Sequence, residues 1–159
     1  MISDKELKEL SIRDYRPEWR PYFESLNRVW IEKYFAMEPH DEFLLTNPEN
    51  AILSNGGKIL FALLDEKVIG TVAIIKIDDV TYELSKMGVE ESFRGNGVGK
   101  QLCAAAISKA RAMGASRLIL YTHSSLKNAI RIYERMGFKE IPVEPGKYDR
   151  ADVKMELKL

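Results

Sequence analysis

The sequence contains little cysteine or histidine and carries no excess of charge. Its single cysteine, Cys103, excludes an intrachain disulfide and fits a reducing compartment. The sequence has only two histidines in addition to that cysteine, so no zinc ligand cluster and no metal site are expected. Lysine and arginine together number 24, as do aspartate and glutamate. The resulting net charge of zero argues against a general nucleic-acid binder, which normally has a basic excess.

Long apolar runs are also missing. No stretch is apolar over the length that a membrane span requires. The charged residues 1–6 lack the apolar centre of a signal peptide. We therefore expect a cytoplasmic protein with neither a membrane nor a nucleic acid as partner. A chain of 159 residues, 45% hydrophobic and 30% charged, is expected to form one domain with a substantial core.

The most informative stretch runs from Met87 to Leu102. An expected strand ends near Val89, three glycines follow at alternate positions, and a helix starts near the last of them. Glycines leave backbone amides accessible, and a helix N-terminus adds a partial positive charge. Arg94 and Lys100 flank the loop, so the pattern predicts a phosphate or pyrophosphate site. The three glycines are Gly95, Gly97 and Gly99.

Apolar periodicity predicts the elements around this loop. The expected strands are residues 10–12, 59–64, 68–77, 80–89, 118–121, 138–143 and 153–159. The expected helices are residues 17–35, 41–45, 98–113 and 126–136. Ser124 or Ser125 is the expected N-cap of the last helix. Together these elements predict an α/β sheet that is antiparallel at both ends, with a strand–helix–strand crossover in the middle.

The glycine loop departs from two common nucleotide-binding motifs. Lys100 is followed by Gln101, where a Walker A motif has serine or threonine. The Gly-x-Gly-x-Gly spacing is not the Rossmann fingerprint, and the next strand ends at His123 without an acidic residue for a ribose. A nucleotide-binding protein is therefore a rival interpretation, and a tight turn without a ligand is another.

Two segments together resemble the GNAT superfamily of acyl-CoA-dependent N-acetyltransferases. Residues 94–99, Arg-Gly-Asn-Gly-Val-Gly, are similar to the acyl-CoA loop of that family. Residues 128–138 are similar to a later segment of the family, with Asn128, Tyr133 and a Gly-Phe pair in the family's order. The resemblance is strong from about residue 59 to residue 141 and weak before residue 55.

The resemblance implies a fold and a division of the chain. The fold would be a mixed, mostly antiparallel central sheet of about six to seven strands flanked by about four helices. Residues 1–159 would form a single N-acetyltransferase domain. Within it, residues 1–54 would form the acceptor side, residues 59–141 the acetyl-CoA-binding core, and residues 142–159 the closing strands. The resemblance also implies that a homodimer is to be considered, although the sequence shows no interface.

By the same resemblance, acetyl-CoA is the co-substrate and its contacts come from three segments. Main-chain groups of Met87 and Val89 would pair with the pantetheine arm, and Gly88 would let that arm approach. Asn128 would hydrogen-bond the pantetheine. Tyr133 would protonate the leaving thiolate, although its spacing also suits a core aromatic. The residues that would hold the pyrophosphate are Arg94, Gly95, Asn96, Gly97, Val98, Gly99 and Lys100.

Glu83 is the expected general base, because it matches the position of a glutamate that several family members use, often through water. A solvated or salt-bridged glutamate is the alternative. A regular strand would place Glu83 on the same face as Met87 and Val89. A bulge before Met87 would instead place Glu83 on the opposite face from those two residues. On the acceptor side, Arg150 is a candidate for binding a substrate carboxylate. The acceptor-binding candidates are Trp30, Tyr34, Tyr148 and Arg150.

The expected reaction is direct transfer of an acetyl group from acetyl-CoA to a primary amine, without an acyl-enzyme. A backbone N–H near Val89 would polarise the thioester carbonyl. The expected acceptor is a small-molecule amine. A protein or peptide amine is one alternative, and a non-catalytic CoA-binding sensor or partner-binding module is another. The sequence does not identify the acceptor.

Overall fold

The computed structural model describes residues 2–146 and 149–159. At its centre lies one seven-stranded sheet with the strand order β1-β2-β3-β4-β5-β7-β6. The strands are β1 (Ser11–Asp14), β2 (Lys58–Leu64), β3 (Lys67–Lys76), β4 (Thr81–Val89), β5 (Arg117–Thr122), β6 (Lys139–Ile141) and β7 (Val153–Lys158). The helices are α1 (Asp4–Lys8), α2 (Arg20–Tyr34), α3 (Pro39–Thr46), α4 (Val98–Ala112) and α5 (Lys127–Arg135), with short turns η1 (Pro17–Trp19), η2 (Glu49–Leu53) and η3 (Glu91–Phe93). None of the helices in these two ranges is long and apolar enough to cross a membrane.

The sheet has the mixed topology that the sequence predicts. Every neighbouring pair of strands is antiparallel except β4 and β5, which are parallel and joined by α4. A parallel pair needs such a crossover because the chain must return to the same end of the sheet. The expected α/β fold class is therefore confirmed, with α4 as the single crossover helix between paired parallel strands.

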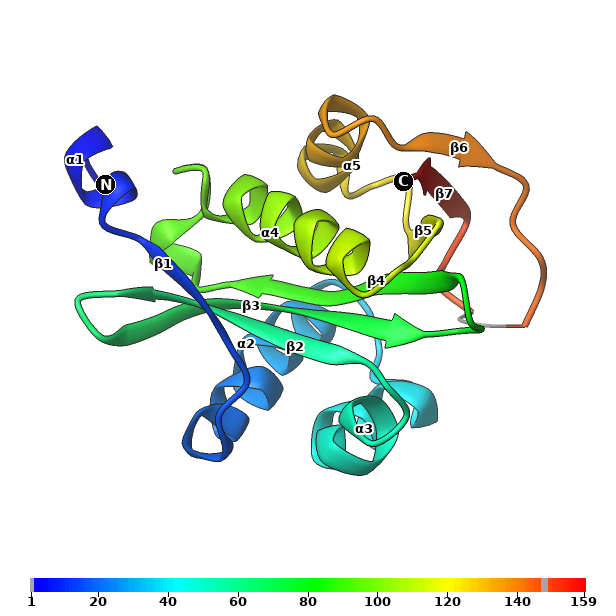
Figure 1. Cartoon of the computed structure of the whole chain (residues 1–159), viewed down its shortest axis with the longest axis horizontal. Coiled ribbons are helices and arrows are strands. Elements are labelled where there is room, and N and C mark those ends of the chain that lie inside the picture. Colours follow the sequence, from blue (N-terminus) through cyan, green and yellow to red (C-terminus); the bar gives the residue numbers. More distant parts are fainter. Residues whose placement is uncertain (1, 147–148) are drawn as a thin grey trace.

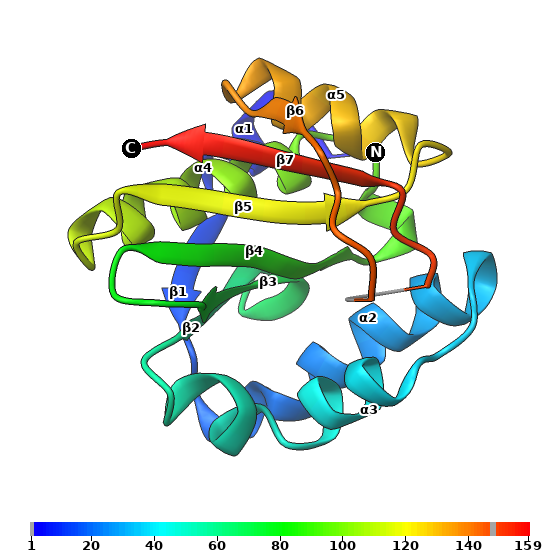
Figure 2. The ribbon, with the colours of Figure 1, turned by 90° about the vertical axis from the view of Figure 1, so that its right-hand side faces the viewer.

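Helices cover both faces of the sheet. Helices α4 and α5 lie on one face, and α2 and α3 lie on the other (Figures 1 and 2). Side chains of β2 alternate between two buried clusters, because successive residues of a strand point to opposite faces. The α4-side core includes Leu60, Ala62, Leu64, Tyr82, Leu102, Leu118 and Tyr133. The α2-side core includes Phe23, Ile31, Leu45, Ile59, Phe61, Leu63 and Ala73.

Two local predictions need correction. Helix α5 begins at Lys127 after Leu126, with no side-chain cap, so neither Ser124 nor Ser125 caps it. Ser124 instead donates to the Asp152 carboxylate, and Ser125 contacts the His123 ring. Strand β6 ends at Ile141, two residues earlier than expected. Residue 142 is a proline, and its missing N–H cannot continue the pairing with β7.

Candidate functional site

The site begins where β4 and β5 stop pairing. The two strands pair only over residues 81–83 of β4, ending with Glu83 opposite Ile119. Beyond that pair, β4 continues along β3 to Val89, while β5 continues along β7. Within the described residues, the later part of β4 therefore has no strand on its β5 side. An extended ligand can pair with such an edge, which is the role expected of Met87 and Val89.

A β-bulge interrupts β4 at Lys86. Ala73 of β3 lies opposite Ser85, whereas Thr71 lies opposite Gly88. One residue separates the first two partners along β3, but two residues separate the others along β4. Lys86 has a φ of 54°, in the left-handed region that L-residues rarely adopt. The extra residue reverses the side of the sheet on which each later side chain of β4 lies.

The bulge separates Glu83 from the expected cofactor edge. Glu83 lies opposite Ile75, which packs in the α2-side core. Met87 and Val89 pack against the α4-side core. A regular strand would have placed all three β4 side chains on one face. The structure has the bulged alternative, so Glu83 faces the α2 and α3 side and the expected cofactor edge faces α4.

Two glycines with positive φ shape the loop between β4 and α4. Gly95 has φ 79° and Gly97 has φ 88°, and Gly97 directly precedes α4. The Gln101 amide donates to the Gly97 carbonyl at 3.0 Å. The amides of residues 98–100 come before this bond and have no acceptor within the helix. Their N–H groups and the positive end of the helix dipole form the kind of anion site that the sequence predicts.

Two polar side chains of the loop bond to its own backbone. The Asn96 amide donates to the carbonyls of Phe93 and Arg94, at 3.2 and 3.0 Å. Arg94 Nε donates to the Val89 carbonyl at 3.2 Å, which links the loop to the end of β4. Lys100 is exposed in the first turn of α4. The loop thus keeps its shape through local bonds, and Lys100 supplies mobile charge beside the helix start.

Gly88 lies against α2. A Cβ at this position would be 3.0 Å from the Leu26 carbonyl oxygen and 3.3 Å from Asn27 Oδ1. Asn27 is fully buried, donates to the Phe23 carbonyl and accepts a bond from Trp30 Nε1. The sequence suggests that Gly88 leaves room for a ligand. The structure adds a second reason for glycine, which is the close crossing of α2 over β4.

Asn128 and Tyr133 lie at different depths on α5. Asn128 is exposed near the start of the helix, whereas Tyr133 is 7% exposed and its ring lies 5.9 Å from that of Phe138. Burial, with a smaller contribution from Cys103, raises the pKa of the Tyr133 hydroxyl well above its usual range. Tyr133 therefore keeps its proton at neutral pH, as a general acid must. Burial also raises the pKa of the Cys103 thiol to about 12, so this residue is no thiolate nucleophile.

Glu83 is buried among titratable groups. Only 1% of its surface is exposed. Burial lowers the pKa of the nearby Lys86 ammonium, and the charges of Asp41 and Glu83 oppose that decrease. Burial and a hydrogen bond to Glu144 raise the pKa of Tyr121, and Glu83 adds to this increase. The sequence-predicted base is therefore close to a buried lysine and to a tyrosine of β5.

Asp41 is the centre of a buried ionic network that sequence reasoning missed. Its fully buried carboxylate accepts hydrogen bonds from Lys86 Nζ and from both terminal nitrogens of Arg150, each at 2.7 Å. Glu38, just before α3, accepts bonds from Arg150 Nη1 at 2.9 Å and from the Asp149 amide at 3.0 Å. The network therefore joins α3, β4 and the segment between β6 and β7.

The network determines the charge state of Asp41. Burial would raise the pKa of Asp41, but hydrogen bonds from Arg150 and Lys86 outweigh it and hold this pKa well below its usual range. One sequence signal could have led to the network. Lys86 is a lysine inside a largely buried strand, and a lysine in such a position needs a buried partner. In the described ranges, no three His, Cys, Asp or Glu side chains are grouped to bind a metal ion.

Phe35, which follows α2, brings two acceptor-side candidates together. Its ring centre lies 6.3 Å from that of Trp30 and 5.5 Å from that of His123. The central guanidinium carbon of Arg150 lies 5.7 Å from the same ring. Trp30 and Arg150 are thus on one side of the molecule, next to the end of β5. Phe35 is the residue that connects them.

The other two acceptor candidates are Tyr34 and Tyr148. Tyr34 has half of its surface exposed. Tyr148 lies outside the described residues. The guanidinium of Arg150 already donates to Asp41 and Glu38, so a substrate carboxylate would have to compete with both. The structure therefore favours a structural role for Arg150 over carboxylate binding.

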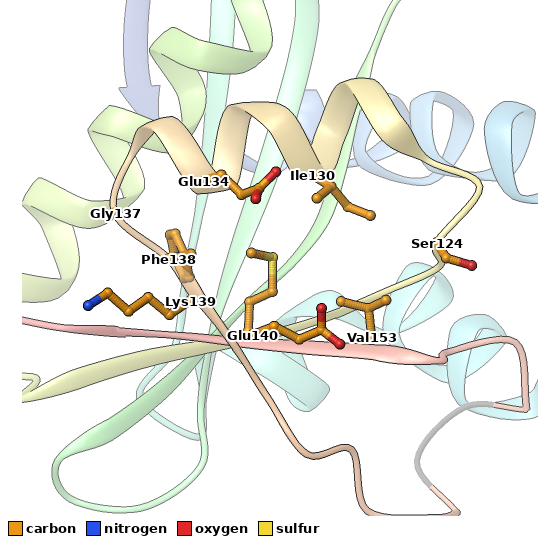
Figure 3. A pocket seen from close by; sticks show the side chains of 9 residues that line it. Ser124, Ile130, Glu134, Gly137, Phe138, Lys139, Glu140 and Val153 are labelled. Carbon is orange, nitrogen blue, oxygen red and sulfur yellow. The ribbon is translucent and has the colours of Figure 1, made fainter.

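An open hollow of about 540 Å³ lies between α5 and strands β6 and β7 (Figure 3). Ile130 and Glu134 of α5 line it on one side, and Val153 and Met155 of β7 line it on the other. None of its lining residues is among the expected cofactor, acceptor or catalytic residues. It is therefore a separate feature from the β4 edge and the ionic network.

Known proteins resemble this chain in both sequence and fold. The model of the acetyltransferase (GNAT) family matches residues 6–138. The uncharacterized N-acetyltransferase YvbK of Bacillus subtilis is 30% identical over 105 residues, which are 64% of this chain and 68% of YvbK. The chain spans about half, or less, of the length of several other curated relatives.

Two solved structures extend the comparison over nearly the whole chain. An acetyltransferase from Streptococcus agalactiae has a TM-score of 0.81 and 28% identity, covering 96% of this chain and 99% of that protein. The PaiA N-acetyltransferase of Thermoplasma acidophilum, in complex with coenzyme A, has a TM-score of 0.75 and 20% identity, covering 94% and 99%. At 20% identity the likeness to PaiA concerns the fold alone. Because the family match includes both the glycine loop and the Tyr133 segment, the chain belongs to the GNAT family of acetyltransferases.

Proposed function

We propose that the protein transfers the acetyl group of acetyl-CoA to a primary amine of a small molecule. One observation carries the proposal: within the described residues, the later part of β4 has no strand on its β5 side, and the glycine loop connects it to the amides at the start of α4, which have no acceptor within the helix. Such an edge can pair with a pantetheine arm, and such amides can bind a pyrophosphate. The coenzyme A bound to PaiA, a protein of similar fold, supports the same cofactor here.

In this proposal the backbone of Met87 and Val89 pairs with the pantetheine arm. The Val89 carbonyl accepts a bond from Arg94 and retains a second lone pair for the ligand. Amides of the glycine loop and of the first turn of α4 bind the pyrophosphate, with added charge from Arg94 and Lys100. Asn128, exposed at the start of α5, hydrogen-bonds the pantetheine.

The proposed chemistry uses groups from both faces of the sheet. The amine nitrogen attacks the thioester carbon, and a backbone N–H near Val89 stabilises the developing oxyanion. As the C–N bond forms, Glu83 accepts the amine proton through a water molecule. As the C–S bond breaks, Tyr133 donates its proton to the CoA thiolate. Support comes from the burial of Glu83 toward α2 and α3, and of Tyr133 beneath α4 and α5.

Thiol release from acetyl-CoA tests the proposal. The protein is incubated with acetyl-CoA and a panel of amines, amino acids, polyamines and basic peptides, and CoA binding is measured in parallel by calorimetry. We expect micromolar CoA binding and thiol release that depends on a small amine. Turnover with peptides alone would favour a protein or peptide acceptor. CoA binding without turnover on any acceptor would favour a non-catalytic sensor, and absence of CoA binding would contradict the proposal.

A further inference from the structure

The β4 bulge is located at a residue that does not favour its conformation. Pairing on either side shows that β4 holds one extra residue between Ser85 and Gly88. That pairing does not determine which residue takes the left-handed conformation. Lys86 takes it, with φ 54°. Because this conformation is unfavourable for a residue with a Cβ, an interaction that strand pairing does not supply is expected to stabilise it at Lys86.

The ion pair with Asp41 is that interaction. The Lys86 side chain is 3% exposed and that of Asp41 is 0% exposed, with Nζ and Oδ1 2.7 Å apart. Asp41 is itself held by the two terminal nitrogens of Arg150 and by the backbone amide of Glu38. Its position is therefore fixed by groups that do not belong to β4. In the left-handed conformation of Lys86, its Nζ reaches this anchor.

We propose that the Lys86–Asp41 pair keeps the bulge at residue 86 and thereby positions the adjacent backbone of Met87 and Val89 for CoA. Lys86 is then a positioning residue for the acetyl donor, and we rely here on the proposed function, in which CoA lies along this edge. Met87 follows Lys86 directly, so a bulge moved by one residue would turn the Met87 side chain and peptide groups to the other face. The acceptor side, through Asp41 of α3, would in this way control the geometry of the donor side.

Two substitutions of Lys86 separate backbone positioning from charge. Both Lys86→Gly and Lys86→Met remove the ammonium, but only glycine adopts positive φ without strain. We expect Lys86→Gly to bind CoA within about threefold of the wild type. We expect Lys86→Met to bind about tenfold more weakly, about 1.4 kcal/mol, because the competent bulge becomes a minor conformation. Calorimetry with CoA alone measures both, so no acceptor is needed.

A control variant removes a more exposed lysine–aspartate pair away from the site. Lys109 and Asp14 lie 2.8 Å apart near the other end of α4. Lys109→Met is expected to leave the CoA dissociation constant unchanged. A tenfold weaker affinity in this variant would show that loss of any lysine–aspartate pair affects the site, and would overturn the inference.

Thermal unfolding distinguishes positioning from a general structural role. Methionine keeps an apolar side chain that can pack on either buried face of β4, whereas glycine has no side chain and leaves a void. We therefore expect a higher melting temperature for Lys86→Met than for Lys86→Gly, the reverse of their order in CoA affinity. Equal CoA affinities, or the same order in both measurements, would overturn the inference. Failure of the wild type to bind CoA would instead overturn the proposed function.

Discussion

The two residues proposed to move protons, Tyr133 and Glu83, are both buried, but on opposite faces of the sheet. Tyr133 is surrounded by the α4-side core and keeps its proton because burial raises its pKa. Glu83 is also buried, and it lies near the Lys86 ammonium on the α2 and α3 side of the sheet. The proposed acid and base thus have different surroundings on opposite faces of one sheet.

Glu83→Gln tests the base. The amide has nearly the same shape but cannot accept a proton, so kcat at neutral pH is expected to fall by about 10²-fold or more. CoA affinity, measured by calorimetry, is expected to stay within twofold, since Glu83 faces away from the Met87 edge. An unchanged kcat with the acceptor found in the panel would exclude Glu83 as the base.

Tyr133→Phe tests the acid. Loss of the hydroxyl alone is expected to lower kcat by about 10²-fold, because the thiolate then leaves without a proton donor. Tyr82→Phe is the matched control, since Tyr82 is 5% exposed in the same core and has no proposed role. Equal kcat values for these two variants would assign Tyr133 to core packing only.

The sequence correctly predicted the helices and strands whose conformation follows from the local pattern of apolar residues. The apolar run of β2 and the helical spacing in α2 and α4 produced the expected elements. Predictions failed where a distant partner competes for a local group. Ser124, a good N-cap by type, bonds to Asp152 from a segment 28 residues later.

Gly88→Ala tests the packing of one element on another. The added Cβ would lie 3.0 Å from the Leu26 carbonyl oxygen, a backbone atom of α2 that cannot move alone. We expect a loss of about 1–3 kcal/mol in the free energy of unfolding, measured with urea. Gly99→Ala is the control, because its Cβ would meet only the flexible ends of Ile132 at 3.4 Å and Met87 at 3.9 Å, and alanine favours a helix. A neutral Gly88→Ala would show that α2 shifts freely over β4.

At the scale of the whole molecule, the Asp41 network connects segments from three distant parts of the chain. It joins α3, β4 and the residues just before β7. Loss of one partner from a buried pair commonly costs about 3–5 kcal/mol, since the remaining charge is left in a poorly solvated place. The network is therefore expected to make a large contribution to the placement of the acceptor side.

The pH dependence of stability tests this contribution. The folded-state pKa of Asp41 is lowered below its unfolded value of about 3.9. Its stabilisation is thus fully present above that unfolded value and is lost as pH falls through the folded value. We expect Asp41→Asn to melt well below the wild type at pH 7, with a smaller difference at pH 3. A difference that is constant between these pH values would show that the Asp41 charge does not stabilise the fold.

The sequence by itself determined the order of the elements, the glycine loop and the family, because each of these depends on local spacing. The spacing of Gly95, Gly97 and Gly99 was enough to indicate the loop, and the Tyr133 segment needed only its order along the chain. Expectations of a cytoplasmic location, a homodimer and a small-molecule acceptor remain predictions.

Only the tertiary structure decided which face of β4 each side chain occupies, and which charges meet on the acceptor side. The bulge at Lys86 reverses the faces on which the later side chains of β4 lie. The position of this bulge depends on pairing with β3 and on the carboxylate of Asp41, 45 residues earlier in the chain. Alternation along a strand cannot reveal one extra residue, because the pattern is local while the forces that hold the residue are not.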